Sequence, residues 1–445
     1  MLEALAHRAL DAAKRAGADA ADALAHEADG LSMEVREGAL ELAERAEGIE
    51  IGLRVLVGQR QACVSISDIR DSAIDVMAER AVAMAKEAPE DPFCGLADPD
   101  QLVTSWDVDA LDLNDTSPLP SAEELAEAAK QAEAAALAVK GIAQVSSAGA
   151  DASRGRRHAA MSNGFSAGYA RSSYALSCVA ITGEGLAMER DYAAEGRIYA
   201  SDMPTPEEIG RLAAQRTLER AGATQPKTGA YPVLFDERIS QSLIGHLTAA
   251  INGSSIARGN SWLMDAMGEQ VLPAGLSLTC DPTRPRIGGS RPYDGEGLPV
   301  SVRDVVRDGI LTGWTLDLAS ARKLGMKSTG DAMRGTSSPP SPALSNLSLT
   351  QGTKSRAELI ADMGDGLLVT SLMGSTVNPN TGDYSRGASG FWIRGGQIAE
   401  AVNECTIAGN LRDMLRTIIP ANDARTHLSR VVPSLLVEGL TIAGG

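Results

Sequence analysis

The histidines are the first residues to consider for metal chemistry in this 445-residue chain, and there are five: His7, His26, His158, His246 and His427. No two of them lie within ten residues of each other. A catalytic zinc site commonly takes two histidines from one helix, with a glutamate beside the first as general base. His246 falls on the helix predicted over 237–251, and residues 238–264 contain no Asp or Glu. This segment therefore cannot supply a paired-histidine zinc site, although a site assembled from distant residues stays open.

Other catalytic motifs are absent or incomplete. The run Gly325–Thr329 resembles a phosphate loop but lacks the glycine four residues ahead of an adjacent Gly-Lys. Gly295-Glu296-Gly297 lacks the third glycine of a dinucleotide fingerprint, and no G-x-S-x-G nucleophile elbow occurs. We interpret Ser389 as a turn serine. The five cysteines are scattered singly without a C-x-x-C pair, which favours a reducing compartment over a disulfide framework.

The most specific polar string is Gly382-Asp383-Tyr384-Ser385-Arg386-Gly387, which lies between two strand-like runs. Its composition predicts a turn in which Asp383 accepts hydrogen bonds from neighbouring backbone amides. Phe391 and Trp392 are expected to anchor the strand that follows. The residues alone do not give a reason for so specific a string.

The elements that must position these residues form an α+β order rather than a regular βαβ alternation. Helical spacing at the N-terminus ends at Gly17, and alternation predicts strands around 31–35, 49–57 and 62–66. Helices are predicted over 71–88, from the capping box at Ser121 and from Thr205-Pro206 to about Gly222. Between the last two, residues 145–200 are strand-like, with Asn163-Gly164 as a hairpin turn.

Composition along the chain predicts two domains. The N-terminal domain covers 1–223, with subsegments 1–95 and 118–223 joined by a Pro/Asp-rich stretch at 89–120 that we interpret as a linker or long loop. The boundary falls at 223–229. The C-terminal domain, 224–445, is β-rich, with a strand at 231–235 and a helix over 237–251.

The formal net charge is −17, and all of the excess acid lies in residues 1–140. Neither part is basic, so the composition argues against direct binding of nucleic acid, although a small local basic patch stays open. The first residues carry Glu3, Arg8 and Asp11 and have no continuous apolar stretch, and no apolar run approaches the ~20 residues that span a bilayer. We therefore expect a cytoplasmic protein without a membrane segment.

Several segments in this order and spacing resemble the TldD/PmbA family, the "modulator of DNA gyrase" peptidases, and most of all its PmbA (TldE) branch. The resemblance covers essentially the whole chain. The segments that carry it are Met161–Phe165, the Tyr231–Asp236 strand with the helix after it, Tyr293–Gly297, Ser328–Gly330, Gly382–Gly387, Thr406–Asn410 and Pro433–Leu436. Within them, the signature positions of unknown role are Asn163, Gly164, Gly382, Asp383, Tyr384, Ser385, Arg386, Gly387 and Asn410.

The resemblance implies a TldD/PmbA-like architecture and a role beside a catalytic partner. TldD-type chains of the family carry an H-E-x-x-x-H zinc motif on the helix matching 237–251, with a cysteine ligand nearer the C-terminus. Here His246 is at most a vestigial ligand, its partner histidine and glutamate are missing, and Cys405 does not obviously match the metal cysteine. We therefore expect no catalytic residue and no bound metal in this chain, and zinc in a TldD-like partner subunit.

The expected function is that of a PmbA/TldE-like, non-catalytic subunit of a heterodimeric zinc metallopeptidase acting on peptides or unstructured protein segments. The isolated chain is expected to expose an apolar interface and to form homodimers when the partner is absent. Two alternatives stay open. One is an independent hydrolase whose metal site is assembled from distant residues or at a homodimer interface. The other is a non-proteolytic binding protein that modulates a target such as DNA gyrase.

Overall fold

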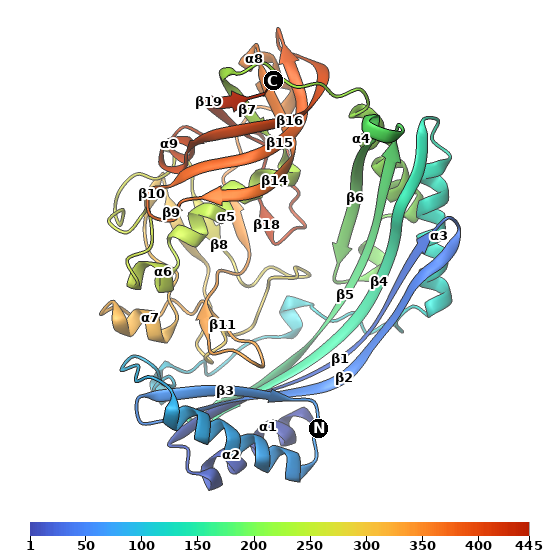
Figure 1. The fold of residues 1–445 in the computed structure, drawn as a ribbon. Helices are drawn as coiled ribbons and strands as arrows, with labels where there is room; N and C mark the ends of the chain where they lie inside the picture. The colour runs from blue at the N-terminus through green and yellow to red at the C-terminus, as the bar shows by residue number, and fades with distance from the viewer. Residues whose placement is uncertain (445) are drawn as a thin grey trace.

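One long antiparallel sheet forms the N-terminal part of the computed structural model, which describes residues 1–444 apart from the side chain of Ser375 (Figure 1). Its strand order is β3-β2-β1-β4-β5-β6. The strands are β1 (Ala20–Arg36), β2 (Ala39–Val57), β3 (Arg60–Ile66), β4 (Ile142–Met161), β5 (Ser166–Thr182) and β6 (Glu189–Arg197).

The predicted strands are confirmed, but several are much longer than the sequence pattern indicates. Residues 39–48 of β2 are all exposed, including Leu40 and Leu42, so no buried face marks this half of the strand. The predicted hairpin is also confirmed: Asn163 and Gly164 connect β4 to β5, and Gly164 has a positive φ of 101°. Pairing with neighbouring strands extends the sheet where no hydrophobic signal marks it.

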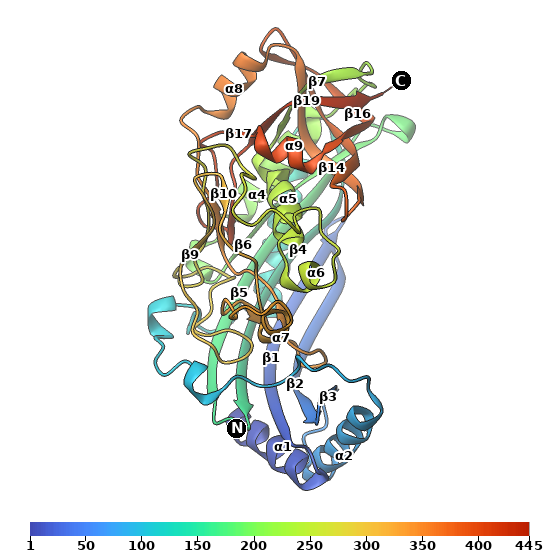
Figure 2. The same cartoon turned by 90° about the vertical axis from the view of Figure 1, so that its left-hand side faces the viewer.

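Two helix pairs cover one face of this sheet, one pair at each end (Figures 1 and 2). Alternate residues of β1 show the division: Ala21, Ala23 and Ala25 pack with the first pair, and Met33 and Val35 with the second. The predicted C-cap at Gly17 and the capping boxes at Ser121 and Thr205 are confirmed. The pairs are α1 (Leu2–Ala16) with α2 (Asp71–Glu87), and α3 (Ala122–Leu137) with α4 (Pro206–Glu219).

The segment at 89–120 is a long loop, as predicted, and it packs against the C-terminal part. Val103 N–H donates to the Gly297 carbonyl at 2.9 Å, and Arg286 N–H donates to the Leu111 carbonyl at 2.9 Å. Leu111 and Leu113 are buried. The loop contains the 3-10 turns η1 (Pro99–Gln101) and η2 (Asp109–Leu111); two more, η3 (Gly185–Ala187) and η4 (Ala200–Asp202), flank β6.

A second six-stranded sheet dominates the C-terminal part, in the order β16-β15-β14-β7-β19-β17. An additional pairing of β16 with β19 closes five of these strands into a ring. Helix α5 packs its buried Leu243, Ile244 and Leu247 into the main core, and α8 covers a separate cluster. The strands are β7 (Gly229–Phe235), β14 (Gly366–Val377), β15 (Asp383–Arg394), β16 (Gln397–Asn410), β17 (Ile419–Pro420) and β19 (Leu435–Ala443), with helices α5 (Glu237–Ala250), α8 (Arg356–Met363) and α9 (Leu411–Arg416).

A smaller five-stranded sheet completes this part and packs into the same core. It consists of β8 (Leu278–Cys280), β9 (Arg303–Arg307), β10 (Ile310–Leu311), β13 (Leu347–Leu349) and β18 (Arg430–Val431). The remaining elements are α6 (Gly253–Ala257), α7 (Leu318–Lys323) and the pair β11 (Ala332–Met333) and β12 (Ser341–Pro342). The predicted α+β class is confirmed. No helix among residues 1–444 is both long and apolar enough to span a bilayer.

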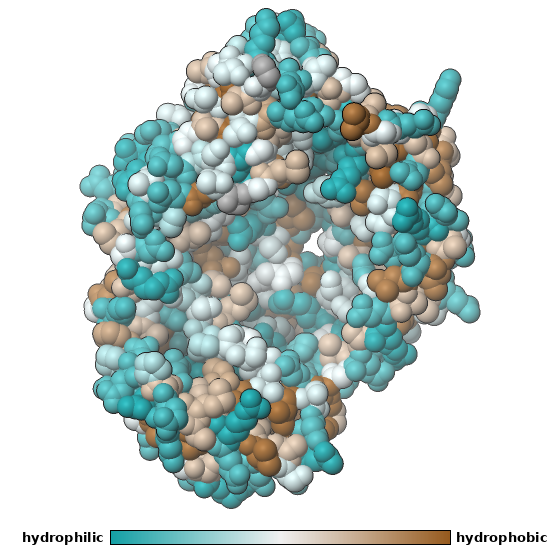
Figure 3. All heavy atoms as spheres, in the orientation of Figure 1, coloured by the Kyte–Doolittle hydropathy of each residue, from teal (hydrophilic) through white to brown (hydrophobic). Residues whose placement is uncertain are grey.

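The C-terminal part contacts the long sheet at both ends, and the space between is hollow (Figure 3). At one end Arg334 binds Asp22 of β1, and at the other Arg238 of α5 binds Asp191 of β6. The uncovered face of the sheet lines this hollow, and we call it the inner face. We call the helix-covered face the outer face. Any extended ligand in the hollow would run between the inner face and the C-terminal part.

Candidate functional site

Helix α5 carries His246 half-buried against the strand that holds the Gly382–Gly387 string. The His246 and Tyr384 rings lie edge to face, with 5.8 Å between their centroids. His246 Nε2 and the Tyr384 hydroxyl are both buried and have no hydrogen-bond partner among the described residues. Burial, and then the nearby Arg386 guanidinium, lower the pKa of His246. The structure thus joins three of the predicted positions, His246, Tyr384 and Arg386, into one cluster.

This cluster does not fit a zinc ion. It offers one imidazole and a phenol, whose pKa burial raises to about 12, and the adjacent arginine repels a cation. Cys405 is buried on β16, where its Sγ contacts the Ala388 carbonyl at 3.2 Å, and burial raises the pKa of its thiol to about 11. A zinc ligand must be deprotonated, so this thiol is poorly suited to the role.

Within residues 1–444, one trio of side chains brings three candidate metal ligands within 4.8 Å of one another: Glu3, His7 and His158. It lies on the outer face, beside α1, where the Ser166 hydroxyl already bonds to both imidazoles at 3.0 and 2.9 Å. Neither His246 nor Cys405 belongs to such a group. The independent-hydrolase alternative needs a metal cluster at the predicted site, and this chain by itself does not provide one there.

The turn before β15 explains several signature positions as structural. Asn410 Nδ2 donates to Asp383 Oδ1 at 3.1 Å and to the Thr381 carbonyl at 3.0 Å, while Asn410 Oδ1 caps α9. The prediction that Asp383 accepts from backbone amides is wrong. Asn378 takes that role, because its side chain lies inside the turn whereas Asp383 begins β15. Gly382 has a positive φ of 81°.

The rest of the string lies within β15 and not in a turn. Ser385 pairs with Thr376 of β14, and Gly387 pairs with Met373. The interpretation of Ser389 as a turn serine is also wrong: it lies in the middle of β15, and its hydroxyl accepts a hydrogen bond from Arg220 at 2.9 Å. Glycine-rich composition predicted a turn, but strands on both sides pair with this segment and hold it extended.

Two signature segments from different parts of the chain meet at one end of the hollow. Asn163 donates to the Ala97 carbonyl at 3.0 Å, and Phe165 stacks edge-on against Tyr293 at 5.0 Å. A side-chain carbon at Gly297 would lie 2.8 Å from the Phe165 ring, which explains the glycine. The role of Met161–Phe165 and Tyr293–Gly297 is therefore to join the long sheet to the C-terminal part.

The same junction buries two carboxylates, Asp294 and Glu296. Asp294 accepts from three backbone amides, and Glu296 accepts from Leu318 N–H at 2.8 Å. Burial raises the pKa of both groups, and the charge of Asp294 raises the pKa of Glu296 further. Both side chains are buried away from solvent. Their fixed amide contacts identify them as structural carboxylates rather than as an acid–base pair.

Sequence reasoning missed a basic group on the inner face, made of His26, Arg157 and Arg171. Arg157 pairs across the sheet with His26 and with Tyr169, and Arg171 follows on β5. These three residues line a cavity of about 240 Å³ whose wall contains no carboxylate. The signal in the sequence was the Arg154–His158 run, which alternation divides between the two faces of β4. It is the small local basic patch that the overall charge left open.

Comparison with known proteins decides the family. Three consecutive family models, described as the domain 1, central and C-terminal domains of PmbA/TldA metallopeptidases, match residues 21–85, 115–221 and 228–444. The chain belongs to the PmbA/TldD metallopeptidase family. It is similar to Metalloprotease PmbA of Escherichia coli O157:H7, with 36% identity over 427 residues that cover 96% of this chain and 92% of the relative.

Solved structures of family members have the same fold. A candidate modulator of DNA gyrase from Bacteroides thetaiotaomicron superposes with a TM-score of 0.91 at 27% identity, covering 99% of this chain and 98% of that one. TldE from Thermococcus kodakarensis superposes with a TM-score of 0.82 at 19% identity, covering 98% and 99%. The PmbA/TldD resemblance seen in the sequence and the α+β architecture it implied are both confirmed.

Proposed function

We propose that this chain is the PmbA-type, non-catalytic subunit of a two-chain zinc metallopeptidase, and that its TldD-like partner holds the zinc. The observation that carries the proposal is the cluster around His246. This chain matches the family along most of its length, yet its His246 lies beside Tyr384 and Arg386 and, among the described residues, forms no metal-compatible group with a second imidazole or a carboxylate. Helix α5 is therefore present in this chain, but it does not carry the zinc ligands that the family resemblance implies at this place.

The proposed substrates are peptides and unstructured protein segments, and the proposed compartment is the cytoplasm. The hollow between the inner face and the C-terminal part supports a substrate in extended form (Figure 3). Its cavity over β1 to β3 measures about 590 Å³ and opens widely to solvent. Folded proteins are too large for this space, whereas a single extended chain can lie along it.

The test is to purify the chain alone and together with a TldD-like subunit, and to measure zinc content and hydrolysis of an unstructured fluorogenic peptide. We expect background zinc and no hydrolysis for the lone chain, and both in the co-purified pair. Stoichiometric zinc with hydrolysis by the lone chain would contradict the proposal. A pull-down that recovers a topoisomerase but no TldD-like subunit would favour the binding-protein alternative.

The isolated chain is proposed to form homodimers through the surface that normally meets the partner. Light scattering across a concentration series tests this part separately. A strict monomer at high concentration would contradict homodimer formation. The subunit role would still be tested by the zinc and hydrolysis measurements.

A further inference from the structure

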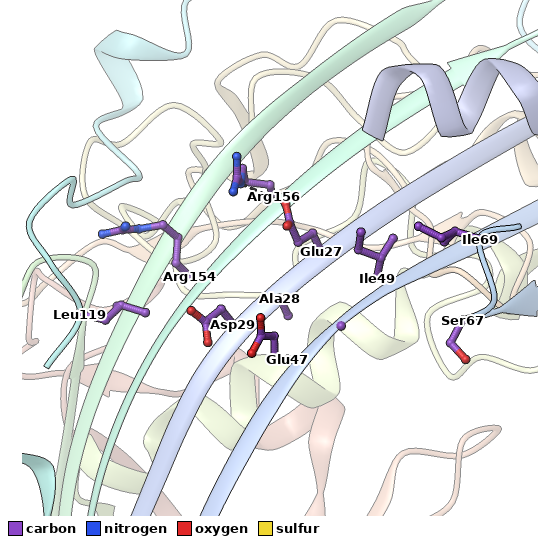
Figure 4. Close-up of a pocket in the computed structure, with 11 residues that line it drawn as sticks. Glu27, Ala28, Asp29, Glu47, Ile49, Ser67, Ile69, Leu119, Arg154 and Arg156 are labelled. Carbon is purple, nitrogen blue, oxygen red and sulfur yellow. Dashed lines mark ion pairs between the residues drawn. The ribbon is translucent and has the colours of Figure 1, made fainter. Parts of the chain in front are cut away.

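Neighbouring arginines on β4 have opposite electrostatic surroundings. Arg156 lies on the outer face, where its Nε is 3.1 Å from Glu27 Oε2. The surrounding cavity of about 540 Å³ is also lined by Asp29, Glu47 and Arg154, so its wall holds three carboxylates and two arginines (Figure 4). Arg157, the next residue, has its side chain on the inner face, because successive side chains of a strand point to opposite faces.

Arg157 has no hydrogen bond or ion pair to any side chain or carbonyl that the structure describes in residues 1–444. Its Nε is buried without a partner, and its guanidinium lies 5.6 Å from the centre of the Tyr169 ring. It lines two adjoining cavities of about 240 and 180 Å³. An arginine whose charge has no counter-ion beside a cavity is available to bind an anion there.

Its neighbours add positive charge. Arg171 is held by the carbonyls of Gly288 and Ser290 from the C-terminal part, and its own Nε is buried and unpaired. Burial lowers the pKa of Arg171, with a further contribution from Arg157. The only carboxylate in the two cavity walls is Asp294, whose two oxygens are occupied by backbone amides.

The floor of the hollow beside these arginines is built from small residues. Gly155 and Ser153 of β4, Ala28 and Gly30 of β1, and Ser173 of β5 occupy the inner face next to the arginines. Gly155 has room for little more: an added side-chain carbon would lie 3.3 Å from His26 Nε2. Small side chains keep the sheet surface open, so an extended backbone can approach it closely.

We propose that Arg157, with Arg171 beside it, forms a carboxylate-binding subsite for an acidic group of an extended peptide in the hollow. The proposal rests on the proposed function for the identity of the ligand as a peptide. Arginine suits this role because its planar fork binds a carboxylate in two places. The carboxylate comes either from an Asp or Glu side chain or from the peptide C-terminus.

Single-stranded nucleic acid is the less favoured ligand. Sites for it combine a basic groove with aromatic side chains on which bases stack. Tyr169 is the aromatic residue of the 240 Å³ cavity, and its ring already packs edge-on against Tyr293 at 5.9 Å. The surface around the arginines therefore offers charge without a stacking platform.

The first experiment measures binding of labelled ten-residue peptides to the full-length, partner-free chain by fluorescence anisotropy. One peptide carries two internal Glu and an amidated C-terminus, the second has Gln in their place, and the third is the Gln peptide with a free C-terminal carboxylate. We expect the Glu peptide, the free-carboxylate peptide or both to bind about tenfold more tightly than the neutral one, as one charge-assisted pair provides. Which of the two gains identifies the source of the carboxylate.

The variant Arg157→Gln should reduce this preference to about twofold or less, whereas Arg154→Gln, on the outer face of the same strand and outside both cavities, should retain it. Equal binding of all three peptides by the wild type would overturn the proposal, as would equal losses in the two variants. Tighter binding of a deoxythymidine decamer than of any peptide would also overturn it. These binding measurements do not involve zinc. If they contradict the carboxylate subsite, the proposed subunit role is unaffected. If the lone chain instead binds zinc, the peptide-binding results still stand.

Discussion

The imidazole of His246 lies edge-on to the phenol ring of Tyr384, with 5.8 Å between the ring centroids, at the place where family resemblance implies a metal ligand. Tyr384 is only 2% exposed, and Arg386 lies on the same side of β15. Burial and this arginine together lower the pKa of His246, so the imidazole is neutral at pH 7. A neutral imidazole could bind a metal, but here it lacks companion ligands and faces a cation.

Replacing His246 by Ala is therefore expected to leave the zinc content of the purified chain at background and peptide hydrolysis by the co-purified pair within about twofold of wild type. Metal analysis and a peptidase assay provide the measurements. The matched control is the same substitution at His427, which belongs to no candidate metal group among the described residues. A large loss of bound zinc for His246→Ala alone would identify His246 as a ligand.

Gly297 joins the two halves of the chain at the Phe165 ring, and Gly297→Ala should destabilise the protein by about 2 kcal/mol or more. Two causes combine: a positive φ of 79° and a contact of 2.8 Å with the ring. Gly268→Ala is the control, because Gly268 has φ of 80° and nothing within 4 Å. Urea denaturation of both variants separates steric conflict from backbone strain, and equal losses would refute the packing role.

Asp22 neutralises two buried arginines, one from each part of the chain. Its oxygens lie 2.5 Å from Arg54 Nε and 2.6 Å from Arg334 Nε, and all three side chains are at most 5% exposed. Asp22→Asn leaves two buried cations without a counter-charge, and we expect a loss of about 3–5 kcal/mol in urea denaturation. Asp362→Asn, which breaks an exposed pair with Lys354, should have no measurable effect.

Glu296 gives stability an unusual dependence on pH. Burial, and next the charge of Asp294, raise the pKa of Glu296 well above its ordinary value, and burial raises the pKa of Asp294 to about 6. The native state therefore binds protons that the unfolded chain, with carboxyl pKa values near 4, has already lost. This contribution favours folding at acidic pH and is lost as the pH rises through the raised values.

The variant Glu296→Gln removes one of these protons from the equilibrium. Its stability relative to wild type should increase between pH 5 and pH 8, as measured by denaturation at several pH values. Glu90→Gln, at an exposed position, is the control and should follow the wild-type curve. Parallel curves for Glu296→Gln and wild type would show that Glu296 is ionised in the native state.

Local patterns in the sequence were sufficient for most elements. Residues close together in the chain determine the capping boxes at Ser121 and Thr205, the hairpin at Asn163-Gly164 and the helix predicted over 237–251. The structure confirms these elements. Ser389 and Asp383 were assigned wrongly because their surroundings come from strands more than ten residues away. Pairing between strands overrides local turn preference.

The sequence by itself determined the α+β class, the family and the absence of any Asp or Glu from residues 238–264. These follow from residue types and their order. Only the tertiary structure decided that Arg156 meets Glu27 while Arg157 faces a cavity without a counter-charge. The reason is geometric: adjacent residues of one strand lie on opposite faces, and the neighbours that complete each environment come from β1, β5 and the C-terminal part.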